Sequence, residues 1–112
     1  MSTDCIFCKI VAGEIPSKKI YEDDEVFAFH DIRPVAPVHF MIIPKRHLAS
    51  LADCDDSHGE ILGKILLHAP RLAKAQGLND GFRTIINTGR GGGQEVYHLH
   101  VHVMGGGTPH PM

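Results

Sequence analysis

Three histidines stand at alternate positions near the end of the chain, at His98, His100 and His102, and an aliphatic residue follows each of them. Side chains of a β-strand point to alternate faces, so this spacing predicts three imidazoles on one face and aliphatic side chains on the other. Near neutral pH an imidazole serves either as a metal ligand or as a nucleophile and proton carrier. The pattern therefore predicts a reactive surface and leaves both chemistries open.

The segment directly before these histidines is a glycine-rich turn, residues 88–94, with glycines at positions 89, 91, 92 and 93. Glycine lets successive backbone N–H groups approach an anion closely, as phosphate-binding loops do. Such a turn on its own is usually a flexible hairpin connection. Its place beside three aligned imidazoles favours a phosphate site.

A second group of reactive side chains begins with the Cys-x-x-Cys pair formed by Cys5 and Cys8. The chain has 3 cysteines, and in a reducing compartment a close pair indicates metal or redox chemistry before a structural disulfide. Together with His47 and His98 the pair makes a Cys₂His₂ set of the type that zinc favours. From spacing alone, a redox pair or two small buried cysteines explain the pattern equally well.

The composition indicates the class of protein that holds these groups. The chain has 112 residues, 43% of them hydrophobic and 21% charged, which predicts a single domain over residues 1–112. The formal net charge is −2 and there is no basic block, which argues against a nucleic acid polymer as partner but not against a single nucleotide. No apolar run is long enough to span a membrane, and the polar first residues do not resemble a signal peptide, so we expect a cytoplasmic protein.

Hydrophobic periodicity predicts the elements that position these groups. Apolar residues three and four apart predict a short helix over 5–12 and a long amphipathic helix over 56–76, which Gly77 ends. Short apolar runs between turns predict strands over 18–21, 26–29, 39–43, 82–87 and 97–104. Strands in hairpin order with one long helix predict an α+β fold, in which the helix covers one face of a five-stranded antiparallel sheet.

Residues 98–104, His-Leu-His-Val-His-Val-Met, resemble the signature of the histidine-triad family, in which three alternating histidines precede apolar residues. Other segments resemble the same family in the same order, so the resemblance covers roughly residues 4–107. They are Cys5-Ile6-Phe7-Cys8-Lys9-Ile10, Phe29-His30-Asp31-Ile32, Ala36-Pro37-Val38-His39-Phe40, Ile43-Pro44-Lys45-Arg46-His47, Asn87 and Gly92-Gly93-Gln94-Glu95-Val96-Tyr97. Within the family, the chain is similar to the Hint-type nucleotide-binding proteins.

This resemblance implies a fold and an activity. The family fold is a five-stranded antiparallel sheet with one long and one short helix, and two protomers join their sheets into a ten-stranded homodimer. The family activity is hydrolysis of nucleoside 5′-phosphoramidates and of acyl- or aminoacyl-adenylates, which releases the purine nucleoside monophosphate through a nucleotidyl-histidine intermediate. The resemblance implies no catalytic cofactor, and some relatives hold a structural zinc ion.

By its position in the resemblance, His100 is the nucleophile that attacks the α-phosphorus. A neutral imidazole nucleophile needs an acceptor, such as a main-chain carbonyl, at its other ring nitrogen to fix the tautomer. The resemblance implies that His102 and His39 donate to phosphate oxygens, that one of them protonates the leaving amine, and that His98 supports catalysis. Related nucleotidyltransferases commonly carry glutamine at the third triad position, so His102 places the chain with the hydrolases.

The resemblance also implies nucleotide and metal contacts. Asp31 binds the ribose hydroxyls. The residues around the base are Phe7, Ile10, Phe29 and Ile32. The groups at the phosphate are Asn87 and the backbone of Gly93, Gln94 and Glu95. Glu95 stands where many relatives have serine. Because a carboxylate and a phosphate repel each other, the Glu95 side chain must turn away from the phosphate. The implied zinc ligands are Cys5, Cys8, His47 and His98.

Two alternatives to an enzyme of this kind stay open at the level of sequence. The first is a zinc-binding module in which the triad itself ligates the metal. The second is a nucleotide-binding regulatory module with negligible turnover. A chelator would abolish the function of the first, whereas the second would bind a nucleotide tightly and hydrolyse almost nothing.

Overall fold

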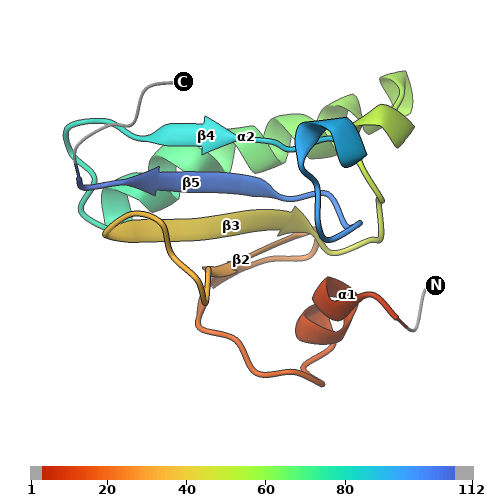
Figure 1. Cartoon of the computed structure of the whole chain (residues 1–112), viewed down its shortest axis with the longest axis horizontal. Helices are drawn as coiled ribbons and strands as arrows, with labels where there is room; N and C mark the ends of the chain where they lie inside the picture. Colours follow the sequence, from red (N-terminus) through yellow and green to blue (C-terminus); the bar gives the residue numbers. More distant parts are fainter. Residues whose placement is uncertain (1–3, 108–112) are drawn as a thin grey trace.

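The computed structural model describes residues 4–107, and within this range the chain has the α+β fold that the sequence predicts (Figure 1). The ends of the predicted single domain, residues 1–3 and 108–112, lie outside the described residues. The helices are α1 (Ile6–Val11) and α2 (Gly59–Ala75), with 3-10 turns at Leu51–Asp53, Asp56–His58 and Arg90–Gly92. The strands are β1 (Lys19–Glu22), β2 (Val26–His30), β3 (Val38–Pro44), β4 (Arg83–Ile85) and β5 (Val101–Gly105).

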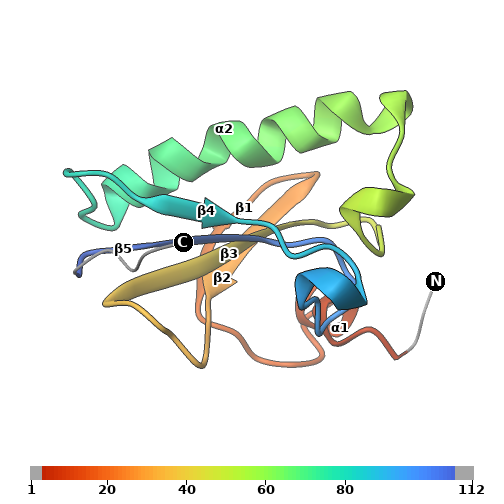
Figure 2. The same ribbon diagram turned by 45° about the horizontal axis from the view of Figure 1, so that its top comes forward.

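The strands form one antiparallel sheet in the order β1-β2-β3-β5-β4. The prediction of simple hairpin order is therefore wrong for β3 and β4, which are not neighbours, and holds for β4 and β5, which pair antiparallel. After β3 the chain crosses one face of the sheet as α2 and returns at the outer edge as β4, and β5 then fills the place between them (Figures 1 and 2). Burial explains this order, because Val101 and Val103 of β5 are 1% and 0% exposed, whereas β4 buries none of its residues fully. The half-buried strand suits the edge of the sheet.

Helix α2 lies along one face of the sheet (Figure 2). Its buried residues recur at the spacing that the sequence predicts, and they are Ile61, Ile65, Ala69, Leu72 and Ala73. They pack against inward side chains of β2, β3 and β5 in one apolar cluster. Gly77 follows the end of the helix with a φ of 88°, a left-handed conformation that favours glycine. This apolar layer decides which side chains of β5 must face away from α2.

The opposite face of the sheet carries α1 (Figure 2). Phe7 and Ile10 pack in a second apolar cluster with side chains of β2 and β3. The Cys5 thiol accepts a hydrogen bond from the Cys8 N–H at 3.3 Å and so caps the first turn. A helix of 6 residues has little stability of its own, so the packing and the cap hold it in place. Helix α1 thereby brings two thiols and the Phe7 ring to the face that α2 leaves uncovered.

The ladder between β3 and β5 begins only at Val101, so the histidine-bearing strand is shorter than the predicted 97–104. Two positions beyond the last pair, Ile42 with Val101, the same register would pair Leu99 with Pro44, which has no N–H to offer. The Pro44 carbonyl is also occupied, because it accepts a hydrogen bond from the His98 ring at 2.7 Å. The Leu99 N–H donates instead to the carbonyl of Leu48, at 2.6 Å.

The two-residue alternation continues outside the ladder. Leu99 is 1% exposed and packs in the cluster under α2. His98 and His100 lie on the other side, where both rings meet the Phe7 ring. The predicted separation of imidazoles from aliphatic side chains is therefore confirmed, although only His102 lies within the strand proper.

Candidate functional site

The main chain holds His100 in one tautomer. The His100 Nδ1–H donates to the carbonyl oxygen of His98 at 2.8 Å, so its Nε2 carries the lone pair. The Phe7 ring packs edge-on against the imidazole, with ring centroids 5.2 Å apart and planes at 85°. An oriented, neutral imidazole with an uncommitted lone pair is the form that nucleophilic attack requires.

A second chain of hydrogen bonds orients His102. The Val35 N–H donates to His39 Nδ1 at 3.1 Å, so a neutral His39 ring carries its proton on Nε2. That Nε2–H donates to His102 Nδ1 at 3.0 Å, which leaves the proton of His102 on its own Nε2. The rings of His100 and His102 are neighbours, with centroids 4.9 Å apart. The site thus offers a lone pair on one imidazole and an N–H donor on the next.

Burial keeps His39 and His102 neutral at pH 7. Desolvation is the main cause that lowers the pKa of His102 to about 4, and the rings of His100 and His39 act in the same direction. Desolvation also lowers the pKa of His39, against the opposing effect of the Asp31 carboxylate. Asp31 Oδ2 lies 3.4 Å from His39 Nε2 and 4.0 Å from His102 Nδ1. A proton added to this pair of rings would therefore be stabilised by Asp31.

The residues predicted to surround a base lie beside the histidines on α1, on β2 and in the loop after β2. Phe7 and Phe29 meet edge to face, with centroids 5.4 Å apart and planes at 80°, and both are buried, as is Ile10. Ile32 differs, because it is 87% exposed in the loop that follows Asp31. The structure therefore joins three of the four apolar residues into one wall and leaves Ile32 on the surface.

The side chain of Gln94 shapes the glycine-rich segment rather than facing a ligand. Its Oε1 accepts the Gly89 N–H at 2.8 Å, and its Nε2 donates to the carbonyls of Ala49 and Val96 at 2.8 and 3.0 Å. Gln94 is only 7% exposed. From the sequence, the backbone of Gln94 is predicted to bind phosphate. Only the folded structure shows that its side-chain amide holds the glycine-rich segment in shape.

Two of the backbone amides predicted to bind phosphate already donate within the turn. The Gly93 and Gln94 N–H groups bond to turn carbonyls at 3.1 and 3.0 Å, and Asn87 Nδ2 donates to the Gly92 carbonyl at 2.8 Å. The Glu95 side chain is exposed, in line with the expectation that it turns outward. Two of the predicted phosphate donors lack a hydrogen bond of this kind within the described part of the chain. They are the Glu95 N–H and the second proton of the Asn87 side-chain amide.

The residues predicted as metal ligands come together at the start of α1. Cys8 Sγ lies 3.3 Å from His47 Nδ1 and 3.5 Å from His98 Nδ1, and Cys5 Sγ lies 3.3 Å from His98 Nδ1. All four ligand atoms lie within 4.8 Å of one another. Neighbouring ligand atoms of a tetrahedral zinc ion are about 3.6 Å apart, given Zn–S of about 2.3 Å and Zn–N of about 2.1 Å. The group therefore fits zinc in both donor type and spacing.

Hydrogen bonding decides which nitrogen His98 presents to this group. Its Nε2–H donates to the Pro44 carbonyl at 2.7 Å, so the lone pair on Nδ1 faces the two thiols. A metal-ligating histidine usually has its other nitrogen held in this way. His98 thus connects the two halves of the site, because its ring belongs to the metal group and its carbonyl orients His100.

A second set of donor atoms, from Asp31, His39 and His102, also lies within 4.8 Å. Here the Val35 amide requires a proton on His39 Nε2, so that nitrogen has no lone pair for a metal. The two clusters therefore differ in kind: the cysteine cluster presents ligands, and the aspartate cluster is a hydrogen-bond chain. Sequence reasoning missed the Val35 amide and the Pro44 carbonyl, because main-chain groups carry no residue-type signal.

The chain matches the family model of the HIT domain over residues 12–108 and belongs to this family, which is the histidine-triad family that its motifs resemble. It is 58% identical over 102 residues to the protein HitA of Neisseria gonorrhoeae, and the match covers 91% of this chain and 95% of HitA. It is 50% identical over 105 residues to a 14 kDa zinc-binding protein of Brassica juncea, with coverage of 92% and 93%.

Solved structures agree with this assignment. A HIT family hydrolase from Legionella pneumophila is 50% identical with a TM-score of 0.91, and the match covers 94% of this chain and 95% of the hydrolase. A histidine triad nucleotide-binding protein from Candida albicans is 36% identical with a TM-score of 0.80, and coverage is 97% and 85%. The predicted family and five-stranded fold are confirmed, and the fold is that of HIT family hydrolases. Within the described residues, no helix is long and apolar enough to cross a membrane.

We expect protein purified without chelator to carry zinc, and Cys5→Ser to lose it. The ion would tie α1 to His98, so its loss should lower Tm by about 5–10 °C, which corresponds to about 1–2 kcal/mol. Native mass spectrometry reports the metal and thermal unfolding reports Tm. Cys54→Ser is the matched control, because Cys54 lies outside the ligand group and its loss should leave zinc in place. A zinc-free wild type, or Cys5→Ser with its zinc retained, would contradict the assignment.

Proposed function

We propose that this protein hydrolyses nucleoside 5′-phosphoramidates and acyl- or aminoacyl-adenylates, and that it releases a purine nucleoside monophosphate. The observation that carries the proposal is the His100 imidazole, whose Nδ1–H is fixed on a carbonyl and whose Nε2 keeps its lone pair. Two similarities support it, one to a HIT family hydrolase and one to a histidine triad nucleotide-binding protein.

The proposed reaction consists of two displacements at phosphorus. First, the lone pair of His100 Nε2 attacks the α-phosphorus, the P–N bond of the substrate breaks, and the amine leaves with the bonding electrons and takes up one proton. Water then attacks the nucleotidyl-histidine, the bond between phosphorus and the imidazole breaks, and one proton of the water is released. The His98 carbonyl accepts the Nδ1–H in both steps and stabilises the charge that forms on the ring.

The cationic form of His102 is the proposed source of the amine's proton. It donates from Nε2 in the first displacement, and the same nitrogen takes a proton from water in the second. A bound phosphate brings negative charge beside the ring and raises its pKa from about 4 in the unliganded chain. When His102 gains a proton on Nδ1, the His39 Nε2–H can turn to Asp31 Oδ2, 3.4 Å away. His39 is therefore a positioning residue.

The nucleoside side of the proposed site is the wall of Phe7, Ile10 and Phe29. A purine base covers more of this apolar surface than a pyrimidine does, so purine nucleotides should bind more tightly. Asp31 would accept hydrogen bonds from the ribose hydroxyls, and the Glu95 N–H would donate to a phosphate oxygen.

Zinc, when bound, would serve a structural role. Cys5, Cys8, His47 and His98 fill the four positions of a tetrahedral ion and leave none for a substrate. A reducing compartment keeps such cysteines as free thiols, which supports a cytoplasmic location. The named similarity to a zinc-binding protein also favours a second candidate function, a zinc-dependent binding module with negligible turnover.

His100→Ala should lower kcat for adenosine 5′-phosphoramidate at least about a thousandfold, because the group that forms the covalent bond is lost. Calorimetry with adenosine monophosphate should show that the variant still binds the nucleotide, which serves as the folding control. Rapid quench of the wild type with labelled substrate should trap an acid-labile adduct. Full turnover by the variant would refute the mechanism, and a wild type that binds nucleotide without turnover would favour the binding module.

His102→Gln should slow the phosphoramidate far more than the acyl-adenylate. An amine must be protonated as it leaves, whereas a carboxylate leaves as the anion, so only the first reaction loses about a hundredfold or more in kcat/KM. In the wild type, phosphoramidate turnover should fall as pH rises through the pKa of His102 in the substrate complex, because the cation is the acid. Equal losses for the two substrates would exclude His102 as the proton source.

We also propose a homodimer that forms through α2 and β4. Leu66 and Leu67 of α2 are 47% and 59% exposed, and Phe82, directly before β4, is 39% exposed. Strand β4 is an edge of the sheet, so pairing with the β4 of a second copy would extend the sheet to ten strands.

Leu67→Asp should shift the protein to monomer in sedimentation velocity at micromolar concentration, because a carboxylate would be buried in the proposed contact. Leu51→Asp is the matched control, since Leu51 is a similarly exposed leucine in a 3-10 turn, outside α2 and β4. A wild type that is monomeric, or a control that dissociates equally, would refute this interface.

A further inference from the structure

The two histidines of the cysteine cluster differ in how firmly the fold holds them. His98 is 0% exposed, and its Nε2–H donates to the Pro44 carbonyl at 2.7 Å. His47 is exposed, and its Nδ1 lies 3.3 Å from Cys8 Sγ. Within residues 4–107, the Nε2 of His47 has no hydrogen-bond partner. Because partners of this kind fix the orientation of a ligating ring, His47 is the histidine that leaves a bound ion more easily.

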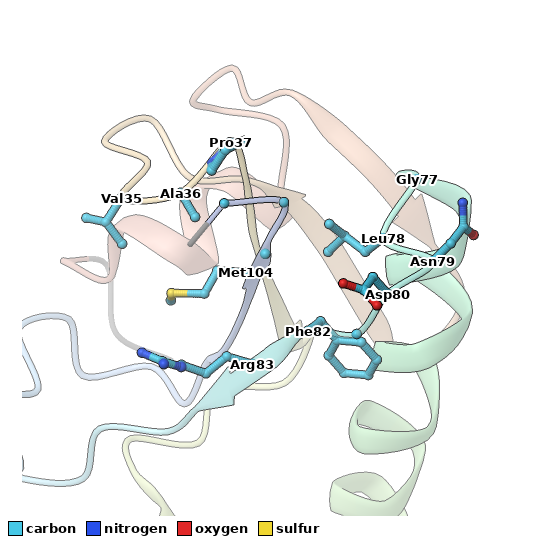
Figure 3. A pocket seen from close by; sticks show the side chains of 14 residues that line it. Val35, Ala36, Pro37, Gly77, Leu78, Asn79, Asp80, Phe82, Arg83 and Met104 are labelled. Carbon is cyan, nitrogen blue, oxygen red and sulfur yellow. The ribbon is translucent and has the colours of Figure 1, made fainter. Parts of the chain in front are cut away.

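A hollow of about 390 Å³ opens beside the cluster on the side of His47. Its lining includes Cys5 and His47 but neither Cys8 nor His98. Figure 3 shows a different hollow, of about 750 Å³, whose lining comes from the loops before β3 and after α2, the start of β4 and the end of β5. None of the residues that line the larger hollow belongs to the cluster. The smaller hollow therefore gives solvent and ions access to two of the four ligands.

The smaller hollow also contains an available carboxylate, that of Glu95. Glu95 is exposed, and its side chain makes no hydrogen bond or ion pair inside the described range. Asp4 lines the same hollow, but it already takes part in another interaction. Glu95 precedes His98 by three positions, so their Cα atoms are at most about 11 Å apart. Zinc binds carboxylate oxygens and expands to five ligands for a short time, so Glu95 has the chemistry to bind the ion while His47 leaves it.

From this arrangement we propose that the smaller hollow is the route by which zinc enters and leaves the cluster, with His47 as the exchanging ligand and Glu95 as a transient one. During release, the Glu95 carboxylate adds to the ion, the His47 imidazole leaves with its lone pair, and a competing chelator enters at the position that His47 has left. Uptake is the reverse, and the two thiols lose their protons as the ion binds. This inference rests on the assignment of zinc to the cluster and goes beyond the proposed hydrolysis.

The first test follows the transfer of zinc from the loaded protein to the chelating dye 4-(2-pyridylazo)resorcinol by absorbance. Glu95→Gln should slow the transfer at least about fivefold, which is what one carboxylate–cation contact contributes in water. The dissociation constant from competition with the dye should stay nearly unchanged, because a transient ligand acts on the barrier and not on the bound state. Asp80→Asn is the matched control, because it removes one carboxylate from the larger hollow in Figure 3 and should leave the rate unchanged.

The second test measures whether Glu95 can replace His47 as a ligand. In His47→Ala the other three ligands remain and the Glu95 carboxylate can fill the fourth position, so this variant should still bind zinc. Adding Glu95→Gln to His47→Ala should weaken zinc binding about tenfold or more, although the same change has almost no effect on affinity in the wild type. Cobalt(II) in place of zinc checks the coordination: its visible absorption should remain that of a tetrahedral ion in His47→Ala and should change in the double variant.

Three results would overturn the exchange route. They are wild-type release from Glu95→Gln, an equal effect of Glu95→Gln on affinity with and without His47, and equal slowing by Asp80→Asn, which would reduce the effect to net charge. The wild type separates two kinds of failure. If it carries zinc while Glu95→Gln releases the ion at the wild-type rate, only this inference fails, and if it carries no zinc, the assignment of the cluster fails.

Discussion

The whole site depends on the buried imidazole of His98, which is 0% exposed. Its Nε2–H bonds to the Pro44 carbonyl, its Nδ1 faces the thiols of Cys5 and Cys8, and its own carbonyl accepts from His100. The first of these contacts fixes the second, because a neutral ring with one nitrogen donating must present a lone pair at the other. One residue thus joins β3, α1 and the proposed nucleophile.

The same logic explains why two clusters of similar composition have different chemistry. His98 donates to a carbonyl and therefore presents a lone pair to the thiols, whereas His39 accepts from the Val35 amide and therefore presents a proton to His102. A main-chain acceptor makes the first ring a ligand, and a main-chain donor makes the second a proton carrier. Burial keeps the second pair neutral, and the nearby Asp31 carboxylate stabilises a proton that arrives with a substrate.

Much of the fold could be predicted because local patterns of apolar residues mark its long helix and its strands. The three- and four-residue spacing of Ile61, Ile65, Ala69, Leu72 and Ala73 predicts α2 and its buried face. Hairpin order failed at the step from β3 to β4, because the pattern of a strand says which side chains are buried and not which neighbour it pairs with. The early end of the β3–β5 ladder also escaped the pattern, since it requires knowing that Leu99 would face Pro44.

The sequence by itself determined the chemical inventory: three imidazoles on one face, a thiol pair with two distant histidines, and a glycine-rich turn before them. These follow from residue type and from the two-residue period of extended backbone, which are local properties. Tertiary structure alone decided which tautomer each imidazole takes and which groups lie next to one another. Tautomers depend on single carbonyl and amide groups from distant segments, at Pro44 and Val35, and the place of Arg83 beside Met104 depends on β4 reaching the sheet edge. Such contacts join residues far apart in the chain, and every residue has a carbonyl and nearly every one an amide, so no spacing in the sequence reveals them.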